Sequence, residues 1–118
     1  MIVAGIGCRR GCTAQDIVAL VRLAQDRAGC HVDALAAPEF KRGEPGLHEA
    51  ARVLGVGLAF IDAEALEAVQ PLCPTRSNAA LRAVGLASVA EGSALAPGGT
   101  LLLARIAGGG VTCALARR

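Results

Sequence analysis

The sequence is poor in aromatic side chains and in lysine. It has no tryptophan or tyrosine and two phenylalanines among 118 residues, and Lys41 is its only lysine. With so few aromatics, the chain lacks the stacking surfaces on which single-stranded nucleic acids are bound. A formal net charge of +2 is also too small for the basic footprint of a nucleic-acid-binding domain. We therefore expect no nucleic-acid partner.

Long hydrophobic runs are missing as well, although 53% of the residues are hydrophobic. Asp, Glu or Arg interrupts the candidates before they reach the roughly 18–20 residues that a membrane helix needs. The first residues, Met1 to Ala4, lack the basic region of a signal peptide and begin an apolar strand. The sequence thus predicts a cytoplasmic protein with no membrane partner, and its length suits a single domain, residues 1–118.

The five cysteines give no metal signature. Cys8 and Cys12 are spaced C-x3-C with no second pair and no His nearby, which is a poor match to a zinc site. The count is odd, so a closed set of disulfides would leave one thiol free. We expect free thiols in a reducing compartment, no metal site and no cofactor, and we assign no role to Cys12.

Apolar runs of strand length alternate with segments of helical periodicity. Strands are predicted at residues 2–6, 31–37, 56–61, 100–106 and 111–116. Helices are predicted at residues 13–28, 46–54, 62–69 and 77–84, and a further short one opens at Ser88 and ends before Pro97. Residues 70–76 are expected to be irregular, and residues 108–110 read as a hairpin turn. The pattern predicts a three-layer α/β/α single domain with a mostly parallel (mixed) sheet of about five strands and a C-terminal hairpin.

A candidate binding site follows the first predicted strand, in the loop Gly5-Ile-Gly-Cys-Arg-Arg-Gly11. Thr13 then caps a helix, with Asp16 in the capping-box position. The loop lacks the glycine spacing of a dinucleotide fingerprint and the ending of a P-loop. It is either a tight turn with solvated arginines or an anion grip made by Arg9, Arg10 and backbone N–H groups. The carboxyl end of a strand in an open α/β sheet favours the grip.

A charged segment, Glu39 to Glu44, follows the second predicted strand and should reach the same edge of the sheet. Glu39 and Glu44 are of the residue type that does acid–base chemistry, and Lys41 is suited to bind an acid or polarise a carbonyl. The alternative is a charged loop that is merely solvated.

A third candidate is Ser88-Val-Ala-Glu91, which has the pattern of a capping box. A capping box would account for both side chains without any chemistry. Neither His31 nor His48 stands near Ser88 in the sequence, so a Ser/His/Asp triad is not indicated. Thr112 is singled out only by its polarity within an apolar strand.

Taken in their order along the chain, these segments resemble the CobE/CbiG C-terminal domain family of cobalamin biosynthesis. The resemblance covers essentially the whole chain and rests on residues 5–11, 36–44, 85–91 with 94–95, and 110–114. It implies a single three-layer α/β/α domain. Where relatives often carry Lys before the last hairpin, this chain has Arg105, which keeps the charge but changes the geometry of a contact.

The resemblance leaves several functions open. In CbiG the domain is the C-terminal part of cobalt-precorrin-5A hydrolase, which opens a lactone on the corrin precursor and releases acetaldehyde. CobE is the free-standing version of the aerobic pathway, and a chain that starts at the first strand resembles that form. This implies an accessory or carrier protein that binds a carboxylate-rich tetrapyrrole intermediate. The alternatives are a lactone hydrolase and a subunit that binds only other pathway enzymes, and a homodimer is plausible.

A corrin precursor is a large apolar ring fringed by carboxylates, so its site needs an apolar surface with a cationic rim. The ligand-binding residues that the resemblance implies are Gly7, Arg9, Arg10, Gly11, Thr13, Lys41, Glu44, Ser88, Glu91 and Thr112. If the chain is a hydrolase, the candidate catalytic groups are Glu39, Lys41 and Glu91.

Overall fold

A computed structural model describes the backbone of residues 1–118 and all side chains except those of Ala79, Ala83 and Val84. Its strands are β1 (Ile2–Cys8), β2 (Ala34–Pro38), β3 (Gly57–Ile61), β4 (Thr100–Gly108) and β5 (Val111–Arg117). Its helices are α1 (Ala14–Ala28), α2 (Pro45–Leu54), α3 (Ala63–Val69), α4 (Asn78–Val84) and α5 (Ala90–Leu95). Two short 3-10 helices are η1 (Glu39–Lys41) and η2 (Gln70–Leu72).

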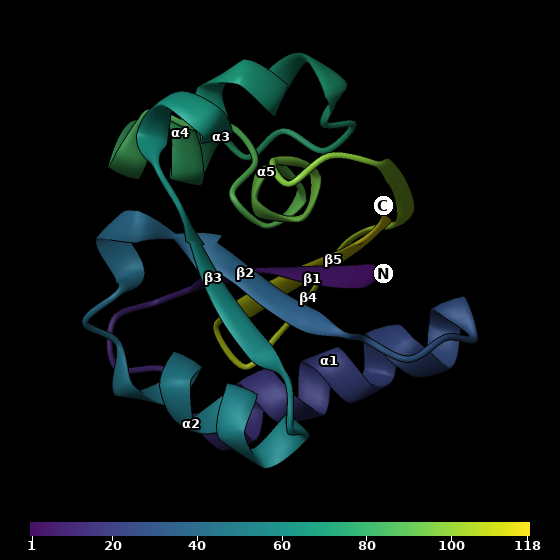
Figure 1. Cartoon of the computed structure of the whole chain (residues 1–118). Coiled ribbons are helices and arrows are strands. Elements are labelled where there is room, and N and C mark those ends of the chain that lie inside the picture. Colours follow the sequence, from purple (N-terminus) through teal and green to yellow (C-terminus); the bar gives the residue numbers. More distant parts are fainter.

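The five strands form one mixed sheet in the order β3-β2-β1-β5-β4. β1, β2 and β3 are parallel, while β5 runs antiparallel to both of its neighbours. Helices α1 and α2 cover one face of the sheet, and α3, α4 and α5 lie over the other face (Figure 1). This arrangement confirms the predicted three-layer architecture and the C-terminal hairpin. Within the described residues, no helix has the length and apolarity to cross a membrane.

The second strand begins at Ala34, later than the predicted start at His31. Side chains take over the backbone bonding at this point. Gln25 Oε1 accepts from Val32 N–H at 2.8 Å, and the Asp33 carboxylate accepts from Ile2 N–H at 2.7 Å. These side-chain bonds hold residues 32–33 in place, although the strand pairing begins only at Ala34.

Two local predictions need correction. The sequence predicts an irregular segment at residues 70–76, but Gln70–Leu72 forms a 3-10 helix, where Pro71 lies in the first turn and its missing N–H is not needed. At the start of α1, Thr13 Oγ1 accepts from Asp16 N–H at 3.1 Å as predicted. The Asp16 carboxylate lies against Gly109 of the hairpin turn, and only this half of the capping box appears among the described contacts.

The larger part of the core lies between the sheet and the α1–α2 layer. Helix α1 turns an apolar face toward the sheet, where Ile17, Leu20, Val21 and Ala24 are all buried. The opposite face of the sheet is covered by the short helix α5, all of whose residues are buried.

Helix α5 lies in backbone contact with β1 because Gly5 has no side chain. A Cβ atom built at Gly5 would collide with the carbonyl oxygen of Ala90 and with the amide nitrogen of Ala94. Both are backbone atoms of α5, so a rotamer change cannot relieve the collision. The missing side chain at Gly5 thus sets the distance between this helix and the sheet.

We expect Gly5→Ala to destabilise the protein by about 3 kcal/mol, since overpacking against rigid backbone forces the helix off the sheet. Gly57→Ala is the matched control, because a Cβ at Gly57 in β3 meets nothing within 4 Å. Urea denaturation of both variants measures the difference. Equal midpoints for the two variants would contradict the close contact between α5 and β1.

Candidate functional site

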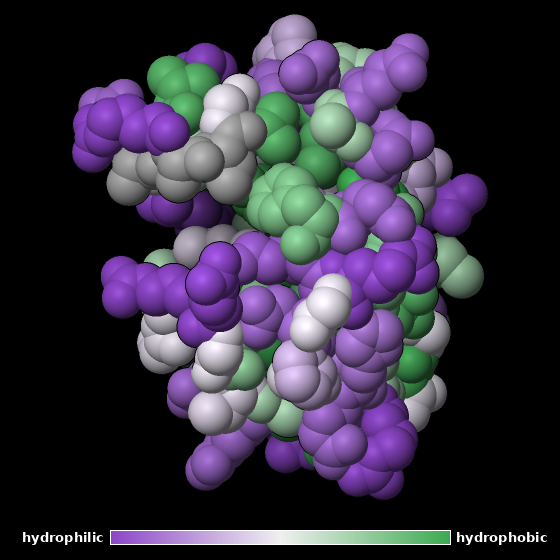
Figure 2. Space-filling view, turned by 90° about the vertical axis from the view of Figure 1, so that its left-hand side faces the viewer, coloured by the Kyte–Doolittle hydropathy of each residue, from purple (hydrophilic) through white to green (hydrophobic). Residues whose placement is uncertain are grey.

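A cavity of about 660 Å³ opens at one edge of the sheet. Its walls come from the carboxyl ends of β1 and β4, the β4–β5 turn, η1, and the starts of α4 and α5. We call it the carboxyl-edge cavity. Its volume lies within the range of about 300–1,000 Å³ that is usual for small-molecule sites. Figure 2 looks onto this side of the molecule, where hydrophilic side chains surround a smaller hydrophobic area.

The charged side chains that line the cavity are all cations. They are Arg9 after β1, Lys41 in η1 and Arg105 in β4. No carboxylate is found among the described lining residues. Hydroxyl groups of Ser and Thr and the exposed ring of Phe40 complete a wall that is otherwise mostly small and apolar. A positive, partly apolar cavity favours ligands that carry both carboxylates and apolar surface.

The floor of the cavity is formed where Gly7 of β1 pairs with Thr112 of β5. Thr112 Oγ1 donates to the Gly7 carbonyl oxygen at 3.4 Å. A Cβ at Gly7 would collide with this hydroxyl oxygen. The glycine therefore leaves room for Thr112, and both predicted residues reach the cavity.

The structure separates the groups of the predicted anion grip. Arg9 lines the cavity, and its side chain runs past Gly110 of the hairpin turn, with Cδ 3.4 Å from the position of a Cβ there. Three backbone N–H groups in or next to the loop donate hydrogen bonds within the protein. Gly11 N–H donates to Glu44 Oε1 at 2.9 Å, Cys12 N–H to the Arg9 carbonyl, and Arg9 N–H to the Gly110 carbonyl. The anion at this corner is the chain's own Glu44.

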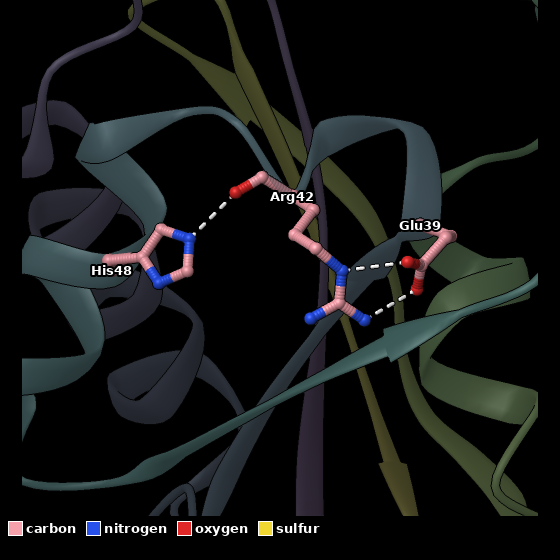
Figure 3. A network of polar contacts seen from close by, with 3 residues as sticks. All are labelled: Glu39, Arg42 and His48. Atoms are coloured by element: carbon pink, nitrogen blue, oxygen red, sulfur yellow. Dashed lines mark hydrogen bonds and ion pairs between the residues drawn. The ribbon is translucent and has the colours of Figure 1, made fainter.

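Glu39 is paired on the outside of η1 and does not line the cavity. The Arg42 guanidinium donates to both carboxylate oxygens of Glu39 (Figure 3), at 2.7 and 2.8 Å. The same guanidinium lies 4.5 Å from the centre of the Phe60 ring. His48 Nε2 donates to the Arg42 carbonyl oxygen at 2.7 Å. The hydrogen bond from Arg42 lowers the pKa of Glu39. This cluster ties η1 to α2 and β3, and so places Phe40 and Lys41 at the cavity.

Ser88 and Glu91 do not form a capping box, because Val89 is the N-cap of α5 and has no side-chain cap bond. The Ser88 hydroxyl donates to Glu91 Oε1 at 2.9 Å. Glu91 is 0% exposed and also accepts from the backbone N–H groups of Thr75 and Arg105. The Ser-x-x-Glu spacing thus serves a different network from the one that the local pattern predicts.

The structure divides the residues implied by the sequence into two groups. Those that line the carboxyl-edge cavity are Gly7, Arg9, Lys41, Ser88 and Thr112. Those that are not among its described lining residues are Arg10, Gly11, Thr13, Glu39, Glu44 and Glu91. Glu44 and Glu91 accept hydrogen bonds from backbone N–H groups, and Thr13 caps α1.

Sequence reasoning missed Phe40, Ser77 and Arg105 as parts of one site. Phe40 is one of two aromatic residues in the chain, and its 53% exposure marks it as unusual. Ser77 is the first residue of the helix predicted at residues 77–84. In the structure it is the N-cap of α4, and its hydroxyl oxygen accepts from Ala80 N–H at 3.1 Å. Arg105 stands out in the sequence only by its charge and by its place where relatives often carry Lys. No local signal joins these three residues, because the fold brings them together.

Metal binding finds no support in the described residues, where no group of three or more His, Cys, Asp and Glu side chains is placed to hold an ion. The five cysteines are free. Burial, and then the neighbouring Cys12 thiol, raises the pKa of Cys8 to about 12. Burial raises the pKa of Cys113 to about 12. Both are protonated, poorly nucleophilic thiols at neutral pH.

Comparison with known proteins decides the family. Residues 2–116 match the model of the family described as "Cobalamin synthesis G C-terminus". This chain belongs to that family. A relative named Protein CobE, from Sinorhizobium sp, is 32% identical over 121 residues, which cover 98% of this chain and 79% of the relative. This member of the cobalamin synthesis G C-terminus family is therefore a protein of cobalamin biosynthesis.

Two solved structures resemble this member of the family closely. The crystal structure of CobE, a protein from the cobalamin (vitamin B12) biosynthetic pathway, is 38% identical with a TM-score of 0.92, covering 100% of this chain and 90% of that one. The cobalamin biosynthesis protein chiG from Agrobacterium tumefaciens str. C58 is 43% identical with a TM-score of 0.79, covering 98% of this chain and 97% of that one. The fold predicted from the sequence is thus also the fold of these relatives.

We expect Cys8 and Cys113 to resist alkylation by iodoacetamide at pH 8, because with a pKa of about 12 only about one thiol in ten thousand is a thiolate there. Mass spectrometry of the digested protein reads out the modified positions. Alkylation in denaturant is the control, in which all five cysteines become labelled. Equal labelling rates of Cys8 in the folded and unfolded chain would show that its thiol is not shielded.

Proposed function

We propose that this chain binds a carboxylate-rich corrin intermediate in the carboxyl-edge cavity, as an accessory or carrier protein of cobalamin biosynthesis. The observation that carries the proposal is the charge of the cavity: Arg9, Lys41 and Arg105 line it, and no carboxylate is found among its described lining residues. Arginine recognises carboxylates in a bidentate manner, and the lysine adds a mobile point charge. Apolar walls between these cations suit the face of a large ring.

The same charge pattern supports binding over hydrolysis. Opening a lactone by general acid–base catalysis needs a group that can accept and release a proton beside the reacting carbonyl. Glu39 is paired with Arg42 and Glu91 is buried behind the wall, and neither lines the cavity. Of the candidate catalytic groups only Lys41 does, so the hydrolase is the second candidate.

Three further expectations from the sequence stay predictions. They are a cytoplasmic location, contact with other enzymes of the pathway, and a homodimer.

A spectroscopic titration of the purified protein with corrin pathway intermediates tests binding and hydrolysis together. We expect a saturable shift of the corrin absorption band with at least one intermediate, and no release of acetaldehyde. Acetaldehyde from a lactone-containing intermediate would instead establish the hydrolase. No shift with any member of the series would overturn the proposed function.

Replacing the lining cations tests where the ligand binds. With dicyanocobyrinic acid as the probe, we expect Arg9→Ala, Lys41→Ala and Arg105→Ala each to weaken binding by about tenfold, since each removes one charge-assisted hydrogen bond. Arg10→Ala is the matched control, because Arg10 belongs to the same loop but is not among the cavity's described lining residues. Dicyanocobinamide, whose peripheral acids are amidated, should bind more weakly than the acid. If Arg9→Ala and Arg10→Ala weaken binding equally, the carboxylates of the ligand contact the loop at a place other than the cavity.

A further inference from the structure

A buried carboxylate behind the carboxyl-edge cavity joins three segments that are distant in the sequence. Glu91 Oε1 accepts from Thr75 N–H at 2.9 Å and from the Ser88 hydroxyl at 2.9 Å. Glu91 Oε2 accepts from Arg105 N–H at 3.0 Å. One side chain thus connects the loop before α4, the start of α5 and the strand β4. All three segments contribute to the cavity wall or lead directly into it.

The carboxylate is stabilised by N–H and O–H donors. Among the described side chains, the ion pairs are Glu39 with Arg42 and Glu49 with Arg52, and neither includes Glu91. Burial alone would raise the pKa of Glu91. The backbone donors of Arg105 and Thr75, together with the Ser88 hydroxyl, outweigh burial and lower the pKa, so the group is charged at neutral pH. Removing any donor would leave a buried charge less well satisfied.

The bond to Arg105 falls where the pairing of β4 is irregular. Leu103 pairs with Leu115 and Ile106 pairs with Cys113, so β4 has one more residue than β5 between these two pairs. Arg105 lies within this β-bulge. Bulges re-aim side chains and leave backbone groups to be satisfied outside the ladder. Here the N–H group of Arg105 donates to Glu91, while the residue itself lines the cavity.

Ser88 has a separate support. Gln70 Oε1 accepts from Ser88 N–H at 3.0 Å, and Gln70 Nε2 donates to the Ser88 carbonyl oxygen at 2.9 Å. The backbone at Ser88 is therefore held on both sides without Glu91. Loss of the Glu91 carboxylate therefore mainly removes the acceptor of the Thr75 N–H and of the Arg105 N–H in the bulge.

We infer that Glu91 is a positioning residue, which holds the bulge of β4 so that Arg105 is presented to a carboxylate of the ligand. Glu91 does not contact the ligand. The inference rests on the proposed function, because it assigns to Arg105 a ligand that the cavity has been proposed to bind. It replaces the catalytic and ligand-binding roles that the sequence implied for Glu91.

The test combines Glu91→Gln with Arg105→Ala in a double-mutant cycle. The E91Q substitution keeps the size of the side chain but replaces one acceptor oxygen by an NH₂ group, which faces backbone donors. With dicyanocobyrinic acid as the probe, we expect E91Q and R105A each to weaken binding by about tenfold, and the double variant to be no weaker than R105A alone. E67Q is the control, because Glu67 is exposed on α3 and loses the same charge.

Hydrogen exchange gives a readout that needs no ligand. In E91Q the amides of Thr75 and Arg105 should exchange faster, while the amide of Ser88, held by Gln70, keeps its protection. If E91Q does not fold, Glu91→Asp takes its place, since the shorter side chain keeps the charge but cannot span the same donors.

The outcomes separate the inference from the function on which it rests. Suppose that the unmodified protein binds the probe. If the double variant loses affinity by the product of the two single-variant losses, or if E91Q keeps its full affinity, the positioning role is overturned. Unchanged exchange at Arg105 would overturn it as well, whether or not the probe binds. If the parent binds no probe at all, the proposed function fails, and with it the role of Glu91 toward the ligand.

Discussion

The close contact between α5 and β1 is the constraint on which the rest of the site depends. Because Gly5 has no side chain, the backbone of α5 reaches the backbone of the strand. This brings the start of α5 to the carboxyl end of β1, where Gly7 leaves space over the Thr112 hydroxyl. A bulkier strand would lift the helix, and the back wall of the cavity would move with it.

Two acidic residues near the cavity accept hydrogen bonds from the protein's own backbone. Glu44 accepts the Gly11 N–H, and Glu91 accepts the N–H groups of Thr75 and Arg105. Each carboxylate is thereby directed away from the cavity lining, where Arg9, Lys41 and Arg105 remain. The positive character of the cavity thus results from where the acids are used, since the chain as a whole carries a net charge of only +2.

Element order, layer arrangement and the edge of the sheet that carries the cavity could be predicted, because each depends on patterns within about 15 neighbouring residues. The contacts that build the site could not. Glu44 lies 33 residues from Gly11, and Glu91 lies 14 residues from Arg105. Ser88 and Glu91 show why: their spacing is that of a capping box, and the local pattern is the same whether Glu91 turns back to its own helix or reaches across to β4. Only the fold distinguishes the two arrangements.

Because Arg105 lies in a bulge, an arginine and a lysine would act differently at this position. An arginine presents a planar, rigid set of donors, so its value in binding a carboxylate depends on its direction more than that of a lysine does. A regular strand alternates its side chains between faces, whereas a bulge re-aims them. A buried carboxylate that fixes the bulge therefore matters more for arginine than for a flexible ammonium group. On this argument, Glu91 and Arg105 form one unit of the site, although only one of them lines the cavity.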